Sequence, residues 1–155
     1  YLEKELTEHD RERAPLKVIG DPAPFGPELV ARLQRAVERT AANDRMTLVV
    51  ALNYGTRTEI AGAARRLAAE VAEGNRDPGS IDAQSIDEAL DTVGLPDPDL
   101  VIRTSGEVRL SNFLLWQAAY AELLFVDTLW PDFDEAAFDD ALNQYATRQR
   151  RFGGR

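Results

Sequence analysis

Two arginines flanked by hydroxyl residues make residues 102–117, IRTSGEVRLSNFLLWQ, the part of the sequence best suited to chemistry. Arg103 and Arg109 lie six positions apart. Hydroxyl or amide side chains stand between and beside them: Thr104, Ser105, Ser111 and Asn112. Arginine forks, hydroxyls and backbone N–H groups at the start of a helix are the groups that hold phosphate oxygens. The stretch therefore predicts a phosphate site. It is equally consistent with a structural role, in which Arg103 pairs with Glu107 or an aspartate and ties down a loop.

Two further positions adjoin apolar runs that favour strands. Glu122 directly precedes the run over residues 123–127. A carboxylate there suits Mg²⁺, which prefers oxygen ligands, but taken alone Glu122 is better explained as an ordinary strand-edge glutamate. Residues 53–55, Asn-Tyr-Gly, end the apolar run over residues 46–55. That is a good position for contacting a ligand, although the sequence slightly favours a plain turn.

Two further sets of residues, both in the C-terminal half, are better explained by structural roles than by binding. An arginine cluster near the end of the chain is either an anion site or a solvated helix end, and its spacing favours the solvated end: Arg148, Arg150, Arg151 and Arg155. Trp116 and Trp130 are interpreted as core residues, because large apolar side chains are mostly buried.

The alternation of apolar runs and helical repeats predicts the elements that position these residues. Strands are expected over residues 16–20, 46–55, 100–104 and 123–127. Helices are expected over residues 2–13, from 27, from 56, over 85–93, from about 110 and over 134–151. Strands joined by helices make an α/β fold with a mostly parallel sheet flanked by helices, in which the run over 46–55 is buried on both faces. Ligands of such sheets bind beyond the carboxyl ends of the strands, where Arg103 and Thr104 stand.

Local signals mark where three of these helices begin. Pro27 suits a first turn, where its missing N–H costs nothing. Thr56 with Glu59, and Ser85 with Glu88, have the spacing of a capping box, in which paired side chains satisfy backbone N–H groups of the first turn.

Composition narrows the class of protein. The 155 residues are expected to form a single domain with a real core. A formal net charge of −9 argues against a nucleic-acid-binding protein, which usually has a basic surface. The absence of cysteine excludes disulfides and thiolate metal sites, and a reducing, cytoplasmic location fits. The sequence has a single histidine, His9, so a metal site built from several histidines is excluded and a Ser-His-Asp triad has only this one candidate.

Three segments resemble the cis-prenyltransferases, specifically the bacterial undecaprenyl pyrophosphate synthases. They are DLVIRTSGEVRLSNFLLWQAAYAELLFVDTLWPDF over residues 99–133, ALNYGTRTEI over 51–60 and RRFGG over 150–154. The resemblance extends from Tyr1 to the end of the chain. It implies an α/β fold and a Mg²⁺-dependent condensation of isopentenyl pyrophosphate with an allylic pyrophosphate such as farnesyl pyrophosphate. The product would be undecaprenyl pyrophosphate, the precursor of the lipid carrier for cell-wall synthesis. Family members are usually homodimers, and the lipid product implies at most peripheral contact with a membrane.

The resemblance also assigns roles by position. Four residues are similar to the family's grip on isopentenyl pyrophosphate: Arg103, Arg109, Leu110 and Ser111. Glu122 is similar to a magnesium ligand. Arg151 and Gly153 are similar to a terminal Arg-x-Gly element, which in the family reaches the diphosphate in a partner subunit's active site.

The chain departs from the family pattern in one large respect. The family's N-terminal half carries an Asp-Gly-Asn-Gly-Arg-Trp loop that supplies the aspartate for metal and diphosphate, and this sequence contains no such loop. The catalytic residues are therefore expected in an N-terminal half, and the chain is interpreted as the C-terminal portion of a cis-prenyltransferase catalytic domain. Two smaller departures are Ser105-Gly106 and Gly55-Thr56, where the family often has Gly-Gly.

Two other hypotheses remain open at this point. A non-catalytic partner subunit of the same fold would donate only its C-terminal Arg-x-Gly tail, but it need not keep the grip over residues 103–111. An unrelated nucleotide-binding α/β domain would carry a Gly-rich loop after a strand, and the sequence contains none.

Overall fold

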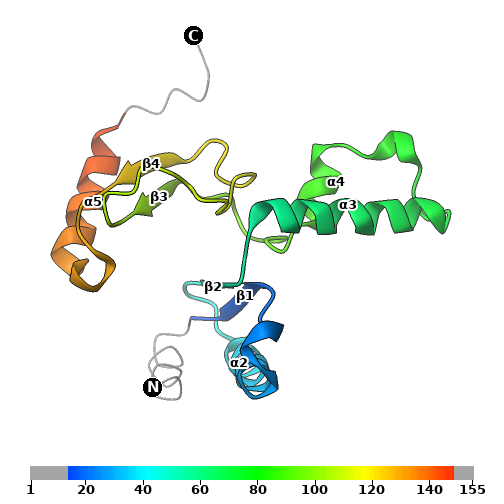
Figure 1. The fold of residues 1–155 in the computed structure, drawn as a ribbon, viewed down its shortest axis with the longest axis horizontal. Helices are drawn as coiled ribbons and strands as arrows, with labels where there is room; N and C mark the ends of the chain where they lie inside the picture. Colours follow the sequence, from blue (N-terminus) through cyan, green and yellow to red (C-terminus); the bar gives the residue numbers. More distant parts are fainter. Residues whose placement is uncertain (1–13, 149–155) are drawn as a thin grey trace, which may run out of the picture. The chain divides into compact units, whose positions relative to one another are not determined.

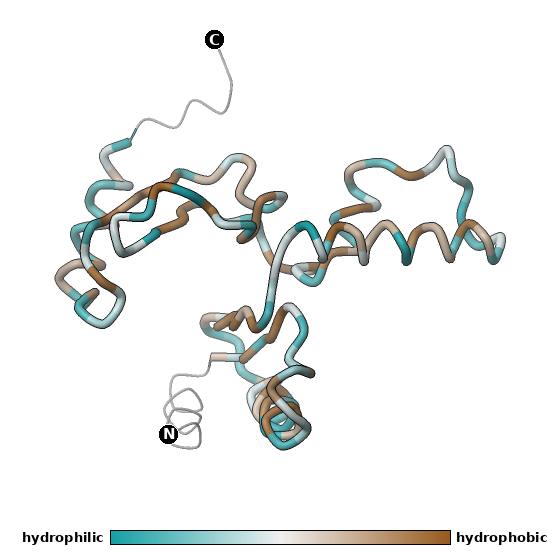
Figure 2. Tube along the Cα trace, in the orientation of Figure 1, coloured by the Kyte–Doolittle hydropathy of each residue, from teal (hydrophilic) through white to brown (hydrophobic). Residues whose placement is uncertain are grey.

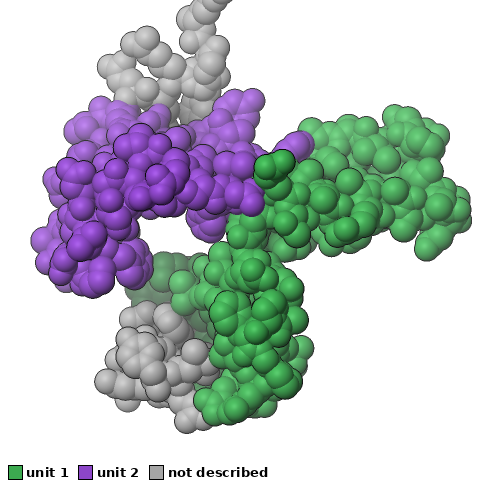
Figure 3. All heavy atoms as spheres, in the orientation of Figure 1, with its two compact units in different colours: residues 1–93 green, residues 94–155 purple. Residues whose placement is uncertain are grey.

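The computed structural model describes residues 14–148 and divides the chain into two compact units, residues 1–93 and 94–155 (Figure 3). The helix expected over residues 2–13 and the tail residues Arg151 and Gly153 lie outside the described residues. Within the described range, helices alternate with parallel strands, so the predicted α/β class is confirmed. Among these residues no helix is long and apolar enough to cross a membrane.

The described residues of the first unit, from residue 14 on, form two strands, three α-helices and two short 3₁₀ turns (Figure 1). In chain order they are β1 (Leu16–Gly20), η1 (Ala23–Phe25), α2 (Pro27–Thr40), β2 (Leu48–Leu52), α3 (Thr56–Ala72), η2 (Pro78–Ser80) and α4 (Ala83–Ala89). The strands β1 and β2 pair in parallel, in a register that runs from Leu16 opposite Leu48 to Gly20 opposite Leu52. Pro27 begins α2, as predicted.

A buried threonine joins α2 to β1. Thr40 is 0% exposed at the end of α2, and its Oγ1 accepts a hydrogen bond of 2.9 Å from the backbone N–H of Leu16. The same hydroxyl donates to the carbonyl of Ala36 at 2.9 Å. Leu33 and Ala36 are the other buried residues of α2. The first backbone N–H of β1 is thus satisfied by a side chain of the helix that packs on it, as a buried polar group requires.

The prediction that the run ending near Gly55 is buried on both faces is wrong for this structure. Every residue of β2 is only half-buried. The physical reason is that the described residues form two separate two-stranded sheets, so each strand is an edge strand with a neighbour on one side. Figure 2 shows that the apolar residues nevertheless concentrate in these strands.

Both predicted capping boxes are wrong in detail. The N-cap of α3 is Gly55, so Thr56 is the first helical residue and Glu59 is used elsewhere. The N-cap of α4 is Asp82, three residues before the predicted cap, and it forms a capping box with Ser85. The Asp82 side chain accepts from the backbone N–H of Ser85 at 2.9 Å, and the hydroxyl of Ser85 accepts from the backbone N–H of Asp82.

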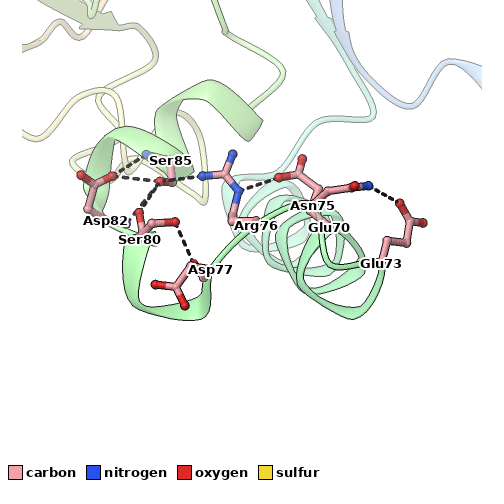
Figure 4. Close-up of polar contacts among 8 residues, drawn as sticks. All are labelled: Glu70, Glu73, Asn75, Arg76, Asp77, Ser80, Asp82 and Ser85. Atoms are coloured by element: carbon pink, nitrogen blue, oxygen red, sulfur yellow. Dashed lines mark hydrogen bonds and ion pairs between the residues drawn. The ribbon is translucent and has the colours of Figure 1, made fainter.

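An arginine ties this cap to the end of α3 (Figure 4). Arg76 Nε donates to Glu70 at 2.6 Å and Arg76 Nη1 lies 3.3 Å from Ser85 Oγ. The hydrogen bond that Arg76 donates to Glu70 raises the pKa of Arg76 above its ordinary value. Hydrogen bonds from the backbone and side chain of Ser85 lower the pKa of Asp82 below its ordinary value.

The second unit is built on another pair of parallel strands. Its elements are β3 (Leu100–Arg103), β4 (Glu122–Phe125), η3 (Trp130–Asp132) and α5 (Glu135–Thr147). The register runs from Leu100 opposite Glu122 to Arg103 opposite Phe125. Helix α5 packs on β4, and the buried residues Leu124 and Ala141 come from these two elements.

The sequence predicts a helix from about residue 110, and this prediction is wrong. Residues 110–121 form successive turns between β3 and β4. Ser111, Asn112 and Leu114 have left-handed backbones, with φ of 49°, 65° and 46°. A left-handed residue interrupts the hydrogen-bond ladder of a right-handed helix, so the apolar spacing of this segment serves packed turns instead.

Two other expectations of the second unit need correction. Trp130 is 73% exposed and stacks on Phe133, with ring centroids 6.3 Å apart, so it is not a core residue; Trp116 is half-buried. Helix α5 ends at Thr147 with Arg148 as its C-cap, earlier than the predicted end at residue 151.

Candidate anion-binding site

The candidate site is a hollow of about 490 Å³ in the second unit, at the carboxyl end of β3. Its volume lies within the ~300–1,000 Å³ typical of ligand pockets. Side chains from the end of the strand and the following loop line it: Ile102, Arg103, Thr104, Ser105, Glu107, Arg109 and Phe113. The hollow thus lies beyond the carboxyl end of a strand, which is the position where parallel α/β sheets bind ligands. Its wall combines cationic, hydroxyl and apolar side chains.

The loop after β3 is held by backbone bonds to the segment after β4. Arg103 accepts from the N–H of Val126 at 2.8 Å, and the N–H of Ser105 donates to Thr128 at 2.8 Å. The N–H of Gly106 donates to Val126 at 2.9 Å. Ser105 and Gly106 both have left-handed backbones, with φ of 70° and 66°, so the chain reverses and brings Glu107 back toward Arg103.

Both arginines contact one oxygen atom of one carboxylate. Arg103 Nη2 lies 3.3 Å from Glu107 Oε2, and Arg109 Nη2 forms an ion pair with the same oxygen. The side chains of Arg103 and Glu107 are 31% and 33% exposed, and that of Arg109 is 63% exposed. The structure therefore brings the two predicted arginines together. The structure also contains the ion pair between Arg103 and Glu107 that the alternative, structural interpretation predicts.

The predicted contribution of a helix start to anion binding is wrong. No helix begins at Leu110 or Ser111 in the described residues. The N–H groups of Ser105 and Gly106 are occupied by carbonyls of the neighbouring loop. Because these backbone donors are occupied, an anion in the hollow would depend mainly on the arginine and hydroxyl side chains.

Leu110 and Ser111 do not line the hollow. Leu110 is half-buried, and Ser111 is exposed with a left-handed backbone. Phe113 lines the hollow instead, although the sequence placed it only in an apolar helix. No signal in the residue types could have identified Phe113, because its position depends on the turns that replace the expected helix.

Glu122 lies away from the arginines. It is the first residue of β4, opposite Leu100, whereas Arg103 is opposite Phe125. Glu122 and Phe125, the residue opposite Arg103, are three strand residues apart, which corresponds to about 10 Å. Arg148 Nη1 lies 3.0 Å from Glu122 Oε2 and also donates to the carbonyl of Leu123 at 2.8 Å. Among residues 14–148 no group of three or more acidic, histidine or cysteine side chains could hold a metal ion.

The first unit has a smaller hollow, of about 180 Å³, at the carboxyl ends of β1 and β2. Asn53, with φ of 46°, and Tyr54 line it, so the segment favoured as a plain turn also borders a cavity. Glu59 also lines it, is 7% exposed, and accepts from Tyr54 Oη at 2.5 Å and from the backbone N–H of Asp91 at 2.9 Å. Sequence reasoning assigned Glu59 to a cap, since its partner Asp91 is distant in the chain.

Comparison with known proteins identifies the class. A profile of the family described as "Putative undecaprenyl diphosphate synthase" matches residues 1–153. The chain therefore belongs to the undecaprenyl diphosphate synthase, or isoprenyl transferase, family, and the resemblance found in the sequence is confirmed.

Individual relatives agree. Isoprenyl transferase 2 of Bradyrhizobium diazoefficiens is 53% identical over 154 residues, which are 99% of this chain and 61% of the relative. The ditrans,polycis-undecaprenyl-diphosphate synthase ((2E,6E)-farnesyl-diphosphate specific) of Escherichia coli K12 is 47% identical over 153 residues, 99% of this chain and 60% of the relative. The chain thus spans about three fifths of the length of these relatives.

A solved structure shares the fold. The crystal structure of lavandulyl diphosphate synthase from Lavandula x intermedia, in complex with dimethylallyl diphosphate, matches with a TM-score of 0.85 and 40% identity. The match covers 90% of this chain and 60% of that chain.

Proposed function

We propose that the chain is part of a cis-prenyltransferase that condenses isopentenyl diphosphate with an allylic diphosphate to make undecaprenyl diphosphate. Farnesyl diphosphate is the proposed allylic substrate, in line with the name of the Escherichia coli relative. The observation that carries the proposal is the convergence of Arg103 and Arg109 in a hollow at the carboxyl end of β3. A non-catalytic partner subunit would have no use for such a hollow.

The composition of the hollow suits a substrate with two chemical halves. Arginine and hydroxyl side chains form charge-assisted hydrogen bonds with diphosphate oxygens. Ile102 and Phe113 offer apolar surface to a short isoprenoid unit. The proposed role of this site is to bind and orient isopentenyl diphosphate, with Leu110 and Ser111 as outer members of the grip.

The proposed reaction is a series of condensations, and each condensation forms one carbon–carbon bond. C4 of the isopentenyl unit bonds to C1 of the allylic substrate, the bond from C1 to the diphosphate oxygen breaks, and a proton leaves the isopentenyl unit. Arg103 and Arg109 contribute by holding one substrate in a fixed orientation, which removes much of the entropic barrier to a two-substrate reaction. No catalytic residue is assigned within this chain, and those groups are proposed to lie in an N-terminal half.

Magnesium is the proposed cofactor, with Glu122 as one ligand. Mg²⁺ is commonly held by one or two carboxylates together with water and substrate phosphates, so a single glutamate fits. The ion pair of Glu122 with Arg148 would have to open for the carboxylate to bind the metal. When bound, Mg²⁺ neutralises charge on a departing diphosphate.

The assembly is proposed to be a cytoplasmic homodimer in which residues 1–155 form the C-terminal portion of one catalytic domain. Arg151 and Gly153 are proposed to contact the diphosphate in the partner's site. The family match over residues 1–153 supports a single domain. The match also reaches into this tail.

Arginine variants of the complete protein test the proposed grip. Arg103→Ala and Arg109→Ala should each raise the KM for isopentenyl diphosphate more than that for the allylic substrate. Each lost charge-assisted contact is worth roughly 1.5–3 kcal/mol, or about 10- to 100-fold, with the more exposed Arg109 at the lower end. Steady-state kinetics with each substrate varied in turn provide the measurement. Unchanged kinetics for isopentenyl diphosphate would reduce both arginines to structural roles.

A further inference from the structure

We propose that Glu107 is an internal substitute for the substrate's diphosphate: it holds Arg103 and Arg109 together in the hollow and must leave them when a diphosphate binds. Glu107 then sets the specificity of the site, because a ligand with more anionic oxygens and more charge displaces it more readily than a monophosphate does. This inference rests on the proposed function, since it takes the hollow to be a diphosphate site.

The geometry places the carboxylate where a ligand oxygen would sit. Arg103 Nη2 and Arg109 Nη2 both contact Oε2 of Glu107, rather than one oxygen each. An arginine usually meets a carboxylate through two parallel hydrogen bonds. Here two arginines converge on one anionic oxygen instead, which is the arrangement they would make around an oxygen of a bound anion.

The local charges make displacement necessary. The charged side chains that line the hollow are two arginines and Glu107, so the carboxylate offsets one of the two positive charges. A diphosphate that entered beside Glu107 would face a like charge at close range and share its donors with it. Once Glu107 has moved away, both guanidinium groups are available to the ligand.

The loop permits this movement without rearranging its backbone. Gly106, just before Glu107, is fixed by its hydrogen bond to Val126, and a Cβ at this position would lie 3.2 Å from Asp127 Oδ1. The Glu107 side chain is 33% exposed, so its carboxylate can rotate into water. The exchange is therefore a side-chain rotation in which water takes over the solvation of the displaced carboxylate.

The consequence for specificity follows from the number of oxygens. Glu107 satisfies the arginines with one oxygen, and a single phosphate gains little by replacing one anion with another. A diphosphate supplies more oxygens and more charge, so it overcomes the competition more readily. Glu107 thus discriminates against monophosphates by occupying the site that they would use.

Binding of inorganic pyrophosphate, measured by calorimetry on the complete protein without added Mg²⁺, tests the inference. Glu107→Gln keeps the shape and removes the charge, so pyrophosphate should bind about two- to fivefold more tightly, as expected for loss of a partly exposed competing charge. Inorganic phosphate should gain more than pyrophosphate does. Glu107→Ala carries the same expectation and decides the matter if the glutamine variant does not fold.

Two controls separate this inference from the proposed function. Glu28→Gln removes a carboxylate from another arginine pair, with Arg32 at 2.7 Å, and should leave binding unchanged. The double variant Arg103→Ala/Arg109→Ala should lose the pyrophosphate binding of this hollow and keep only binding at the proposed allylic diphosphate site. If it does so but Glu107→Gln binds pyrophosphate equally or less tightly, the displacement idea is wrong and Glu107 merely positions the arginines. If the double variant binds normally, the proposed diphosphate site is itself wrong, and the inference with it.

Discussion

At the scale of single residues, Glu122 combines an observed ion pair with a proposed role in binding magnesium. It pairs with Arg148 at 3.0 Å, which fastens the end of α5 to the start of β4. It is also the proposed magnesium ligand. The two roles exclude each other at any moment, because Arg148 and a cation would compete for the same oxygens. Variants that remove one partner at a time can therefore distinguish them.

Glu122→Gln in the complete protein should lower activity and raise the Mg²⁺ concentration needed for half-maximal rate. The amide keeps the size of the side chain and loses the charge that holds a hard cation. Arg148→Gln is the matched variant, because it breaks the same ion pair and leaves the carboxylate in place. If both variants gave the wild-type magnesium titration, Glu122 would have only its structural role.

At the scale of elements, the sequence predicts those features that depend on local patterns. The apolar runs locate all four strands to within a few residues, and Pro27 marks the start of α2. The helix expected after Leu110 fails because three left-handed residues interrupt it, and nothing in Phe113 or Leu114 marks that geometry. Glu59 has the spacing of a cap, but its hydrogen bonds to Tyr54 and Asp91 depend on tertiary structure.

The features of the candidate site also divide into those that the sequence predicts and those that depend on the folded chain. Arg103 and Arg109 were identifiable because their charge and spacing are local properties of one loop. Glu107 appears in the sequence as one of two partners for Arg103. Only the reversal at Ser105 and Gly106 shows that it contacts both arginines. The separation of Glu122 from this hollow follows from the register of β3 and β4, which the strand patterns do not define.

The cap of α4 gives a prediction at this scale. The hydrogen bonds from Ser85 lower the pKa of Asp82 below its ordinary value of 3.8. A carboxyl group whose pKa is lowered by folding stabilises the folded state when the pH is above its ordinary pKa. This contribution is lost as the pH falls through the folded-state pKa. Asp82→Asn also caps the helix but does not titrate. Wild type should therefore lose stability relative to Asp82→Asn on acidification below pH 3.8, in urea unfolding measured at several pH values. Parallel curves for the two proteins would contradict the prediction.

At the scale of the whole molecule, the C-terminal tail is proposed to contact a diphosphate in the assembled protein. The family profile extends through residue 153, and the tail begins just beyond α5, whose last residue is Thr147. Glycine at position 153 allows close approach of backbone to a ligand. A cation at Arg151 would add charge beside that backbone, which suits a diphosphate. These residue types suit the proposed contact with a diphosphate, and mixing variants tests whether the tail makes that contact across the proposed dimer interface.

Mixing two inactive variants of the complete protein tests the tail. One carries Arg151→Ala, and the other carries Arg103→Ala/Arg109→Ala. If the tail acts across the interface, the heterodimer contains one site with an intact grip from the first subunit and an intact tail from the second. Activity should then reappear on mixing and subunit exchange. A mixture that forms heterodimers, verified by differential tagging, yet stays inactive would place the tail in its own subunit's site.

The carboxylate in the arginine hollow also bears on how quickly an anion can reach it. The chain carries a net charge of −9, and Glu107 masks part of the positive charge of the hollow that Arg103 and Arg109 line. At physiological ionic strength the Debye length is about 8 Å, so beyond that distance the arginines exert little pull on an approaching diphosphate. At lower ionic strength, where screening is weaker, the net negative charge of this chain repels an approaching diphosphate. Added salt therefore speeds the diffusional encounter while it weakens the bound state, so the association and dissociation rate constants rise together.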